Sequence, residues 1–394
     1  MTDSAAASPI ISTANRIDTL RLSHTMGVGP VNFARLMTQY GSAGAALAAL
    51  PGRMRKAGRR EAPVIPSVSR MTNELERLEK LGGKMLLRGD ADYPLLLSRV
   101  PDAPPVLFAL GDVQKLSMRS VGVVGARNAS AAGIRIAESL AAEMAHAGIC
   151  VVSGLARGID SAAHAAALHP GLTVGAIAGG LDHVYPPENA SLQQQIAERG
   201  CLVTEALLGT APQARHFPRR NRLIAGISSA CLIIEAALDS GTMITADLAQ
   251  SYNRELLVVP GSPLDPRSRG GNHLLKTGQA ALTENIADIL QVLPSELPKR
   301  EPAPWQRAAR HTPPLTGFSE PSTIWGDISE AGWIDPDLVQ QSVRSLLSVT
   351  PVAVDEVVRR CQFSVSAVLA TLAELELGGV VEFVPGGRVA LLPN

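Results

Sequence analysis

Five turns of the chain combine glycine with hydroxyl, arginine or aspartate side chains, and this combination is suited to binding phosphate. The turns span residues 125–130, 153–160, 178–182, 240–242 and 260–262. A helix is expected soon after Gly125, Gly154 and Gly241, and the start of a helix offers unpaired N–H groups and the positive end of a dipole. Arg127 and Arg157, which lie in two of these turns, would add planar guanidinium groups to the same anion site. A single glycine-rich turn usually reflects only a tight backbone. Because several such turns occur together, we favour phosphate binding.

The pattern does not fit an ordinary dinucleotide or ATP site. Residues 122–127 read Gly-Val-Val-Gly-Ala-Arg, which departs from the G-x-G-x-x-G fingerprint, and no acidic residue closes the second expected strand. A Walker lysine is missing as well, so NAD binding and ATP hydrolysis are not expected. Cys150, Cys201, Cys231 and Cys361 stand singly, without a C-x-x-C pair, and are expected to be buried and reduced. We therefore expect neither a cofactor nor a metal.

A second basic cluster spans residues 215–222, which read Arg-His-Phe-Pro-Arg-Arg-Asn-Arg and contain no acidic residue. Such a cluster beside one aromatic ring suits a groove that follows a nucleic-acid backbone, with a base stacked on Phe217. The alternative is a solvated helix face on which Arg220 or Asn221 pairs internally. On composition we favour nucleic acid.

Several acidic and histidine side chains were weighed as catalytic groups. They are Asp160 with His164, which lie four residues apart on one face of an expected helix, Asp182 with His183, and Glu205 and Glu235, which follow apolar strands. Capping, packing and turn formation explain them better, because no nucleophile or metal set stands near them in the sequence. We expect a binding protein and not an enzyme.

The segment 104–291 predicts an α/β domain with a Rossmann-like, doubly wound, mostly parallel sheet. Short β-branched runs alternate there with alanine-rich helical stretches. The expected strands are residues 121–124, 149–153, 173–178, 202–204, 231–234 and 256–259. Ligands of such sheets bind beyond the carboxyl ends of the strands, which is where the glycine-rich turns fall.

Residues 14–90 read as an N-terminal helical module of the helix-hairpin-helix (SAM-like) kind. Its turn lies at residues 26–30, and a helix is expected to stop at Tyr40-Gly41. Such a glycine turn could approach a phosphate, but a structural role is favoured.

The C-terminal part divides into a linker, residues 292–335, and a winged helix, residues 336–394. The linker is rich in proline and contains all three tryptophans. Helices are expected at residues 338–347, 354–361 and 366–377, before a hairpin at 380–392. The third helix carries Glu374 and Glu376 instead of basic residues, which favours protein contact or packing over reading of the major groove.

Composition limits these interpretations. The 394 residues carry 36 basic and 36 acidic side chains, so a basic coat is excluded and any anion site must be local. The aromatic content of 3% argues against a long platform for stacked bases. The N-terminus lacks the features of a signal peptide, and no apolar run reaches the roughly 18 residues of a spanning helix, so a cytoplasmic protein without membrane contact is expected.

Several motifs of residues 104–291 together closely resemble the DprA (Smf) DNA-processing family. They are Val-Val-Ser-Gly-Leu-Ala-Arg-Gly-Ile-Asp at 151–160 with His164, Tyr185-Pro186, Phe-Pro-Arg-Arg-Asn-Arg at 217–222, and Ser240-Gly241-Thr242 with Thr245-Ala246. The resemblance implies a protein that binds single-stranded DNA taken up in natural transformation, protects it and loads the RecA recombinase onto it. It further implies a homodimer and no catalysis.

The family's nucleic-acid-binding residues can be carried over onto matching positions. They are Gly125, Ala126, Arg127, Ser153, Gly154, Leu155, Ala156, Arg157, Phe217, Arg220 and Asn221. We expect backbone amides and Arg127, Arg157 and Arg220 to hold successive phosphates while a base enters beside Phe217. Many relatives have serine where Ala126 stands, so a hydroxyl contact is lost there.

Two other functions remain open at this point. The same scaffold could carry a nucleotide phosphoribohydrolase-like enzyme, but the P-G-G-x-G-T turn of that class is incomplete, since Asp239 precedes Ser240-Gly241-Thr242. A winged-helix regulator would require sequence-specific duplex binding by residues 338–394.

Overall fold

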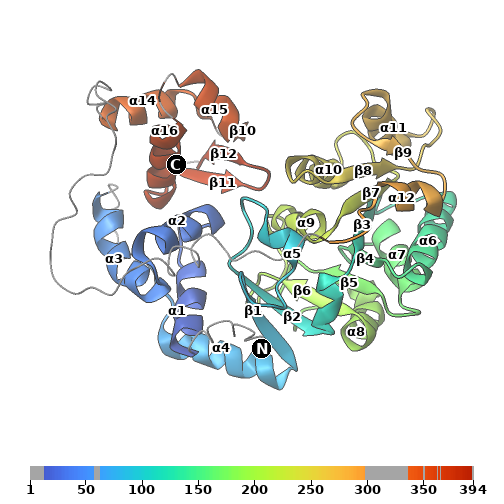
Figure 1. The fold of residues 1–394 in the computed structure, drawn as a ribbon, viewed down its shortest axis with the longest axis horizontal. Coiled ribbons are helices and arrows are strands. Elements are labelled where there is room, and N and C mark those ends of the chain that lie inside the picture. Colours follow the sequence, from blue (N-terminus) through green and yellow to red (C-terminus); the bar gives the residue numbers. More distant parts are fainter. Residues whose placement is uncertain are drawn as a thin grey trace, which may run out of the picture. The chain divides into compact units, whose positions relative to one another are not determined.

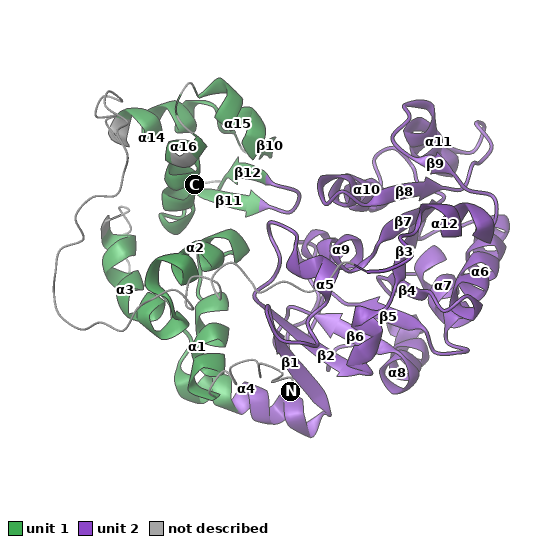
Figure 2. Cartoon of the chain, in the orientation of Figure 1, with its two compact units in different colours: residues 1–72, 304–383, 388–394 green, residues 73–303, 384–387 purple. Residues whose placement is uncertain are grey.

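The computed structural model describes residues 13–56, 63–297, 336–348, 351–361, 363 and 365–392. The chain divides into two compact units (Figure 2). Unit 1 comprises residues 1–72, 304–383 and 388–394, and unit 2 comprises residues 73–303 and 384–387.

A nine-stranded sheet forms the centre of unit 2 (Figure 1). Its strands are β1 (Gly83–Leu87), β2 (Val106–Gly111), β3 (Ser120–Gly125), β4 (Cys150–Ser153), β5 (Thr173–Ala176), β6 (Cys201–Thr204), β7 (Ala230–Ile234), β8 (Glu255–Val258) and β9 (Ala281–Leu282). Their order is β1-β2-β6-β5-β4-β3-β7-β8-β9, with antiparallel pairing only at β1-β2 and β2-β6. The chain builds outward from β3 first through β4 and then through β7, so the direction of winding reverses beside β3, where doubly wound sheets bind ligands.

Helices cover both faces of this sheet. They are α5 (Leu95–Ser98), α6 (Ala131–His146), α7 (Ile159–Ala167), α8 (Ala190–Arg199), α9 (His216–Ile227), α10 (Gly241–Ser251), α11 (Arg269–Lys276) and α12 (Ile286–Val292), with short 3₁₀ turns η1 (Val113–Ser117), η2 (Pro187–Asn189) and η3 (Pro266–Ser268). Alternate residues of β3 serve the two faces: Val121 and Val123 pack with α6 and α7, and Val124 packs with α9 and α10. A further helix, α4 (Val68–Lys80), crosses the boundary between the two units at residue 72.

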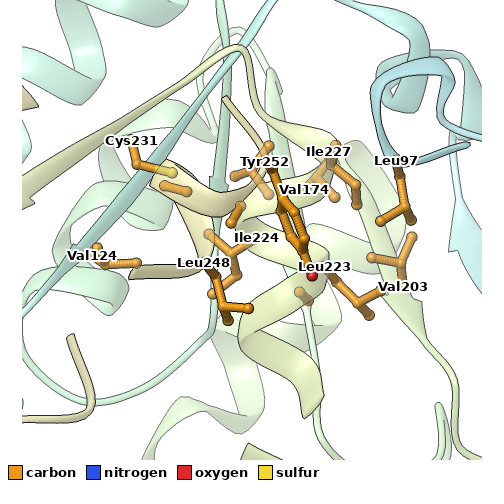
Figure 3. Close-up of a cluster of buried hydrophobic side chains, with 14 of the residues drawn as sticks. Leu97, Val124, Val174, Val203, Leu223, Ile224, Ile227, Cys231, Leu248 and Tyr252 are labelled. Carbon is orange, nitrogen blue, oxygen red and sulfur yellow. The ribbon is translucent and has the colours of Figure 1, made fainter. Parts of the chain in front are cut away.

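Helix α9 supplies much of the core on the face of the sheet to which Val124 points. Leu223, Ile224 and Ile227 lie on one face of the helix and are buried against the sheet and against Leu248 of α10 (Figure 3). Arg222 lies beside this cluster, where its guanidinium donates to both carboxylate oxygens of Glu205. The same helix begins at His216, so its first turn lies at the edge of the sheet while its last two turns are core.

The predicted sheet is confirmed, and each of the six expected strands overlaps a strand of the structure. Strands β1, β2 and β9 were missed. The sequence Gly-Lys-Met-Leu-Leu of β1 has no β-branched residue, β2 has only Val106, and β9 is two residues long, so none shows the expected pattern. Residues 83–87, which the sequence analysis placed with the N-terminal helical module, therefore belong to the sheet.

The expected N-terminal helices and winged helix are confirmed, and the residues of both are counted in unit 1. The helices are α1 (Thr13–Ser23), α2 (Pro30–Tyr40) and α3 (Ala43–Lys56), followed in the C-terminal part by α14 (Pro336–Ser345), α15 (Val354–Arg360) and α16 (Val365–Leu377), with strands β10 (Val352–Ala353), β11 (Val381–Val384) and β12 (Arg388–Leu391). Helix α2 ends at Tyr40 because Gly41 takes the left-handed conformation, with φ of +74°. Residues 298–335 of the expected linker, including the three tryptophans, lie outside the described residues. None of the described helices is long and apolar enough to cross a membrane.

The packing in Figure 3 predicts the effect of a cavity in the core. Leu248 is completely buried, so Leu248→Ala should lower the free energy of unfolding by about 2–5 kcal/mol. Leu290→Ala is the matched control, because Leu290 is 41% exposed and its loss should cost less than about 1 kcal/mol. Urea unfolding followed by circular dichroism measures both, and equal losses would contradict this assignment of the core.

Candidate functional site

A cavity of about 370 Å³ lies beyond the carboxyl ends of β3, β4 and β5. Its lining comes from the turns after these strands and from the starts of α8 and α9. The lining residues are Arg127, Asn128, Gly154, Leu155, Ala156, Arg157, Ile177, Ala178, Gly179, His183, Tyr185, Pro186, Gln193, Pro212, Phe217 and Arg220. One part of the wall is therefore cationic, and another part is apolar and aromatic.

Phe217, in the first turn of α9, is the centre of the aromatic wall. Its ring centroid lies 5.5 Å from that of Tyr185, and the two rings are tilted by 56°. The guanidinium carbon of Arg127 lies 5.4 Å from the Phe217 centroid, and that of Arg220 lies 5.9 Å from it. These distances are within the range of cation–π attraction, so the ring helps to hold a positive charge at the cavity.

Arg127 and Arg157 are the two exposed cations of the lining. The guanidinium of Arg157 pairs with Glu188 at 2.5 Å, and both side chains are more than half exposed, at 62% and 57%. An ion pair so open to water contributes little to stability, about 0–1 kcal/mol. Arg157 can therefore exchange this partner for another anion.

Carboxylates of the protein itself bind backbone amides in two of the three glycine turns that were expected to bind phosphate. At the start of α6, Glu235 accepts hydrogen bonds from the amide of Ser130 and from its hydroxyl. In the turn before α7, Asp160 accepts from the amides of Gly154 at 3.1 Å and Ala156 at 3.4 Å. The amides of Ser130, Gly154 and Ala156 are therefore not open for phosphate, whereas Arg127 and Arg157 are exposed cations of the lining.

Seven of the eleven residues expected to bind nucleic acid line the cavity. They are Arg127, Gly154, Leu155, Ala156, Arg157, Phe217 and Arg220. The other four lie outside its lining and tie the surrounding turns together. The Ser153 hydroxyl donates to the carbonyl of Val123 at 2.6 Å, and the Asn221 amide donates to the carbonyl of Gly241 at 3.4 Å. The carbonyl of Gly125 accepts from Thr242, and that of Ala126 accepts from the amide of Ile159.

Several residues of the lining were not among the eleven expected to bind nucleic acid. Tyr185-Pro186 and the turn at residues 178–182 were noted as motifs, and their position after a strand was the available signal. Gln193 and Pro212 gave no signal, because a glutamine in a helix and a proline in a loop are common. Only the fold brings them to the cavity.

The side chains that the sequence suggested as catalytic groups have structural partners, except for His183, which lines the cavity. His164 is completely buried and its Nδ1 lies 2.6 Å from the Thr173 hydroxyl oxygen, while burial lowers its pKa to about 3. Asp182 accepts from the amide of Gly209. Among the described residues, no cluster of three or more histidine, cysteine or acidic side chains could hold a metal ion.

Burial raises the pKa of Asp160, and the positive charge of Arg220 opposes this rise. Burial likewise lowers the pKa of Arg220, and the charge of Asp160 opposes that shift. Each charge therefore favours the ionised form of the other.

Comparison with known proteins gives a consistent result over the three parts of the chain. A family model described as DNA recombination-mediator protein A matches residues 84–294. Models of a DprA-like N-terminal HHH domain and a DprA winged helix domain match residues 13–76 and 333–387.

Individual relatives agree with these models. Protein Smf of Synechocystis sp. is 32% identical over 388 residues, which cover 94% of this chain and 97% of the relative. The DNA processing protein DprA of Bacillus subtilis is 42% identical over 204 residues, covering 51% of this chain and 68% of the relative. The X-ray structure of DNA processing protein A from Streptococcus pneumoniae is similar with a TM-score of 0.61 and 32% identity, covering 73% of this chain and all of that one.

The burial of His164 predicts a pH dependence of stability. Its pKa is about 3 in the folded protein and about 6.5 in the unfolded chain, so the unfolded chain binds more protons between these values. This contribution to stability is present above pH 6.5 and is lost as the pH falls, by about 2 kcal/mol from pH 7 to pH 5. His164→Gln should remove that part of the profile when unfolding free energies are measured across this range. Parallel profiles for the two proteins would contradict a buried, neutral His164.

Proposed function

Because the chain belongs to the DprA (Smf) DNA-processing family, we propose that it binds single-stranded DNA taken up in natural transformation, protects it and loads the RecA recombinase onto it. The observation that carries the proposal is that two exposed cations, Arg127 and Arg157, and the Phe217 ring line one cavity. A cation for phosphate beside an aromatic face for a base is the combination that single-strand binding requires.

In this proposal Arg127 and Arg157 hold neighbouring phosphates of the strand. Arg157 exchanges Glu188 for a phosphate, and Arg127 is already held over the Phe217 ring. A base then enters the cavity and lies against Phe217. Duplex DNA binds worse, because its bases are paired and stacked and do not reach an aromatic ring inside a cavity.

The proposed role is binding and delivery, without a catalytic step by this chain. The names of the Bacillus subtilis and Streptococcus pneumoniae relatives, DNA processing protein DprA, support a role in DNA processing. The family description, a recombination mediator, supports delivery to a recombinase, and such a protein acts in the cytoplasm. We further propose a homodimer, because one neutral chain with a local cationic site gains affinity when two sites engage one strand.

Arg127 provides the first test. Arg127→Ala should weaken binding of a fluorescent single strand and reduce the slope of log K against log salt by about 0.7, as expected for one lost phosphate contact on single strands. Arg135→Ala is the matched control, because Arg135 is exposed on α6 and does not line the cavity. Titrations at several salt concentrations, with the matching duplex in parallel, measure both effects.

Unchanged affinity in Arg127→Ala, or a flat salt dependence in the wild-type protein, would contradict the proposal. If the wild-type protein bound no single strand and released free base from a nucleoside monophosphate, the phosphoribohydrolase alternative would replace it.

Phe217 provides a test of base stacking. Phe217→Ala should weaken single-strand binding about 5- to 150-fold, because stacking of one base on an aromatic ring is worth about 1–3 kcal/mol. The salt slope should stay near the wild-type value, since no charge is removed. Phe217→Tyr keeps an aromatic face and should retain most of the affinity. Equal losses for the alanine and tyrosine variants would show that no base stacks on this ring.

A further inference from the structure

We propose that Arg220 is a positioning residue, which together with Asp160 and Asn189 fixes the loop of residues 154–157 from inside and makes no contact with phosphate. This inference rests on the proposed function for its consequence, the affinity for single-stranded DNA. It assigns Arg220 a role different from that of Arg127 and Arg157, although all three line the same cavity.

The loop has a backbone conformation that needs support. Leu155 has a φ of +55°, in the left-handed region that a bulky side chain rarely adopts, and its side chain is completely buried. Such a conformation persists when the surrounding structure determines it strongly. Arg157 follows two residues later, so the direction of its side chain depends on this turn.

Three buried side chains from three separate elements bind the polar groups of the loop. Asp160 of α7 accepts from the amides of Gly154 and Ala156. Asn189 of η2 donates to the carbonyl of Leu155 at 2.8 Å. Arg220 of α9 donates through Nη1 to the carbonyl of Gly154 and, at 3.0 Å, to the carbonyl of Ala176 on β5. The inward-facing amides and carbonyls of the loop are thus bound from one side, which leaves its outer side to the cavity.

The charged groups of Arg220 and Asp160 both lie close to Gly154. A Cβ atom at this position would lie 1.8 Å from Nη1 of Arg220 and 2.8 Å from Oδ2 of Asp160. The absence of a side chain at Gly154 therefore makes room for the internal charges. This differs from the expectation that glycine here lets a phosphate oxygen approach the backbone.

Nη1 of Arg220 is committed to two backbone carbonyls of the protein. The residue is 6% exposed, and its Nε is buried without a hydrogen-bond partner among the described residues. Its charge faces the buried carboxylate of Asp160, so little of it remains to attract a phosphate at the rim. Arg157 differs, because its side chain is 62% exposed and its partner Glu188 is also exposed.

The salt dependence of binding separates a positioning residue from a phosphate ligand. We expect Arg220→Gln to weaken single-strand binding at least tenfold at every salt concentration and to leave the slope of log K against log salt at the wild-type value. Arg157→Ala, measured alongside, should reduce that slope by about 0.7. A reduced slope in Arg220→Gln would show that Arg220 contacts phosphate, and unchanged affinity would show that the loop does not depend on it. Either result overturns the proposal.

A second measurement keeps the proposal testable if Arg220→Gln fails to fold. Asn189→Ala removes the neutral hydrogen bonds that this amide donates to the carbonyls of Leu155 and Ala156 and to the Ser161 hydroxyl, and it leaves the buried charges in place. Hydrogen–deuterium exchange without DNA should then be faster in the peptide that covers residues 154–157 and unchanged in α6, while affinity falls with the wild-type salt slope. Unchanged exchange in that peptide would overturn the proposal. Because exchange needs no DNA, this readout stays informative if the wild-type protein proves not to bind single strands, which would instead refute the proposed function.

Discussion

The cavity depends on the direct contact of two backbone turns with no side chain between them. Gly158, before α7, has a φ of +76°, and a Cβ atom there would lie 2.3 Å from the carbonyl oxygen of Ala126. The same Cβ atom would lie 2.7 Å from the carbonyl oxygen of Arg127. Because these approaches are closer than any side chain allows, the turns after β3 and β4 lie against each other. This contact brings Arg127 to the same cavity as residues 154–157.

Charge in this part of the protein is separated into an internal and an external set. The internal carboxylates of Asp160 and Glu235 occupy backbone donors that an isolated turn would offer to any anion. Arg222 of α9 is likewise buried and paired with Glu205. What remains outside is a small number of guanidinium groups around an aromatic ring. A chain with 36 basic and 36 acidic residues can thus have a cationic site without a basic surface.

Much of the fold was predictable from the sequence because the central strands are rich in β-branched residues and the turns between them in glycine. The same local signals identified Arg127, Arg157 and Phe217 at the cavity. The partners of the backbone amides were not predictable, since Glu235 is 105 positions from Ser130 and only the folded sheet brings them together. For Arg220, the motif predicted a place in the site but did not predict that the side chain is buried. Its burial follows from the packing of α9 on β5.

Helix α9 joins the cavity and the core in one rigid element. Phe217 and Arg220 face the cavity from its first turns, and Leu223, Ile224 and Ile227 fix its rotation by packing in the core. One residue inserted or deleted between Arg220 and Leu223 would turn the two parts by about 100° relative to each other. The spacing along this helix is therefore as much a part of the site as the identity of its side chains.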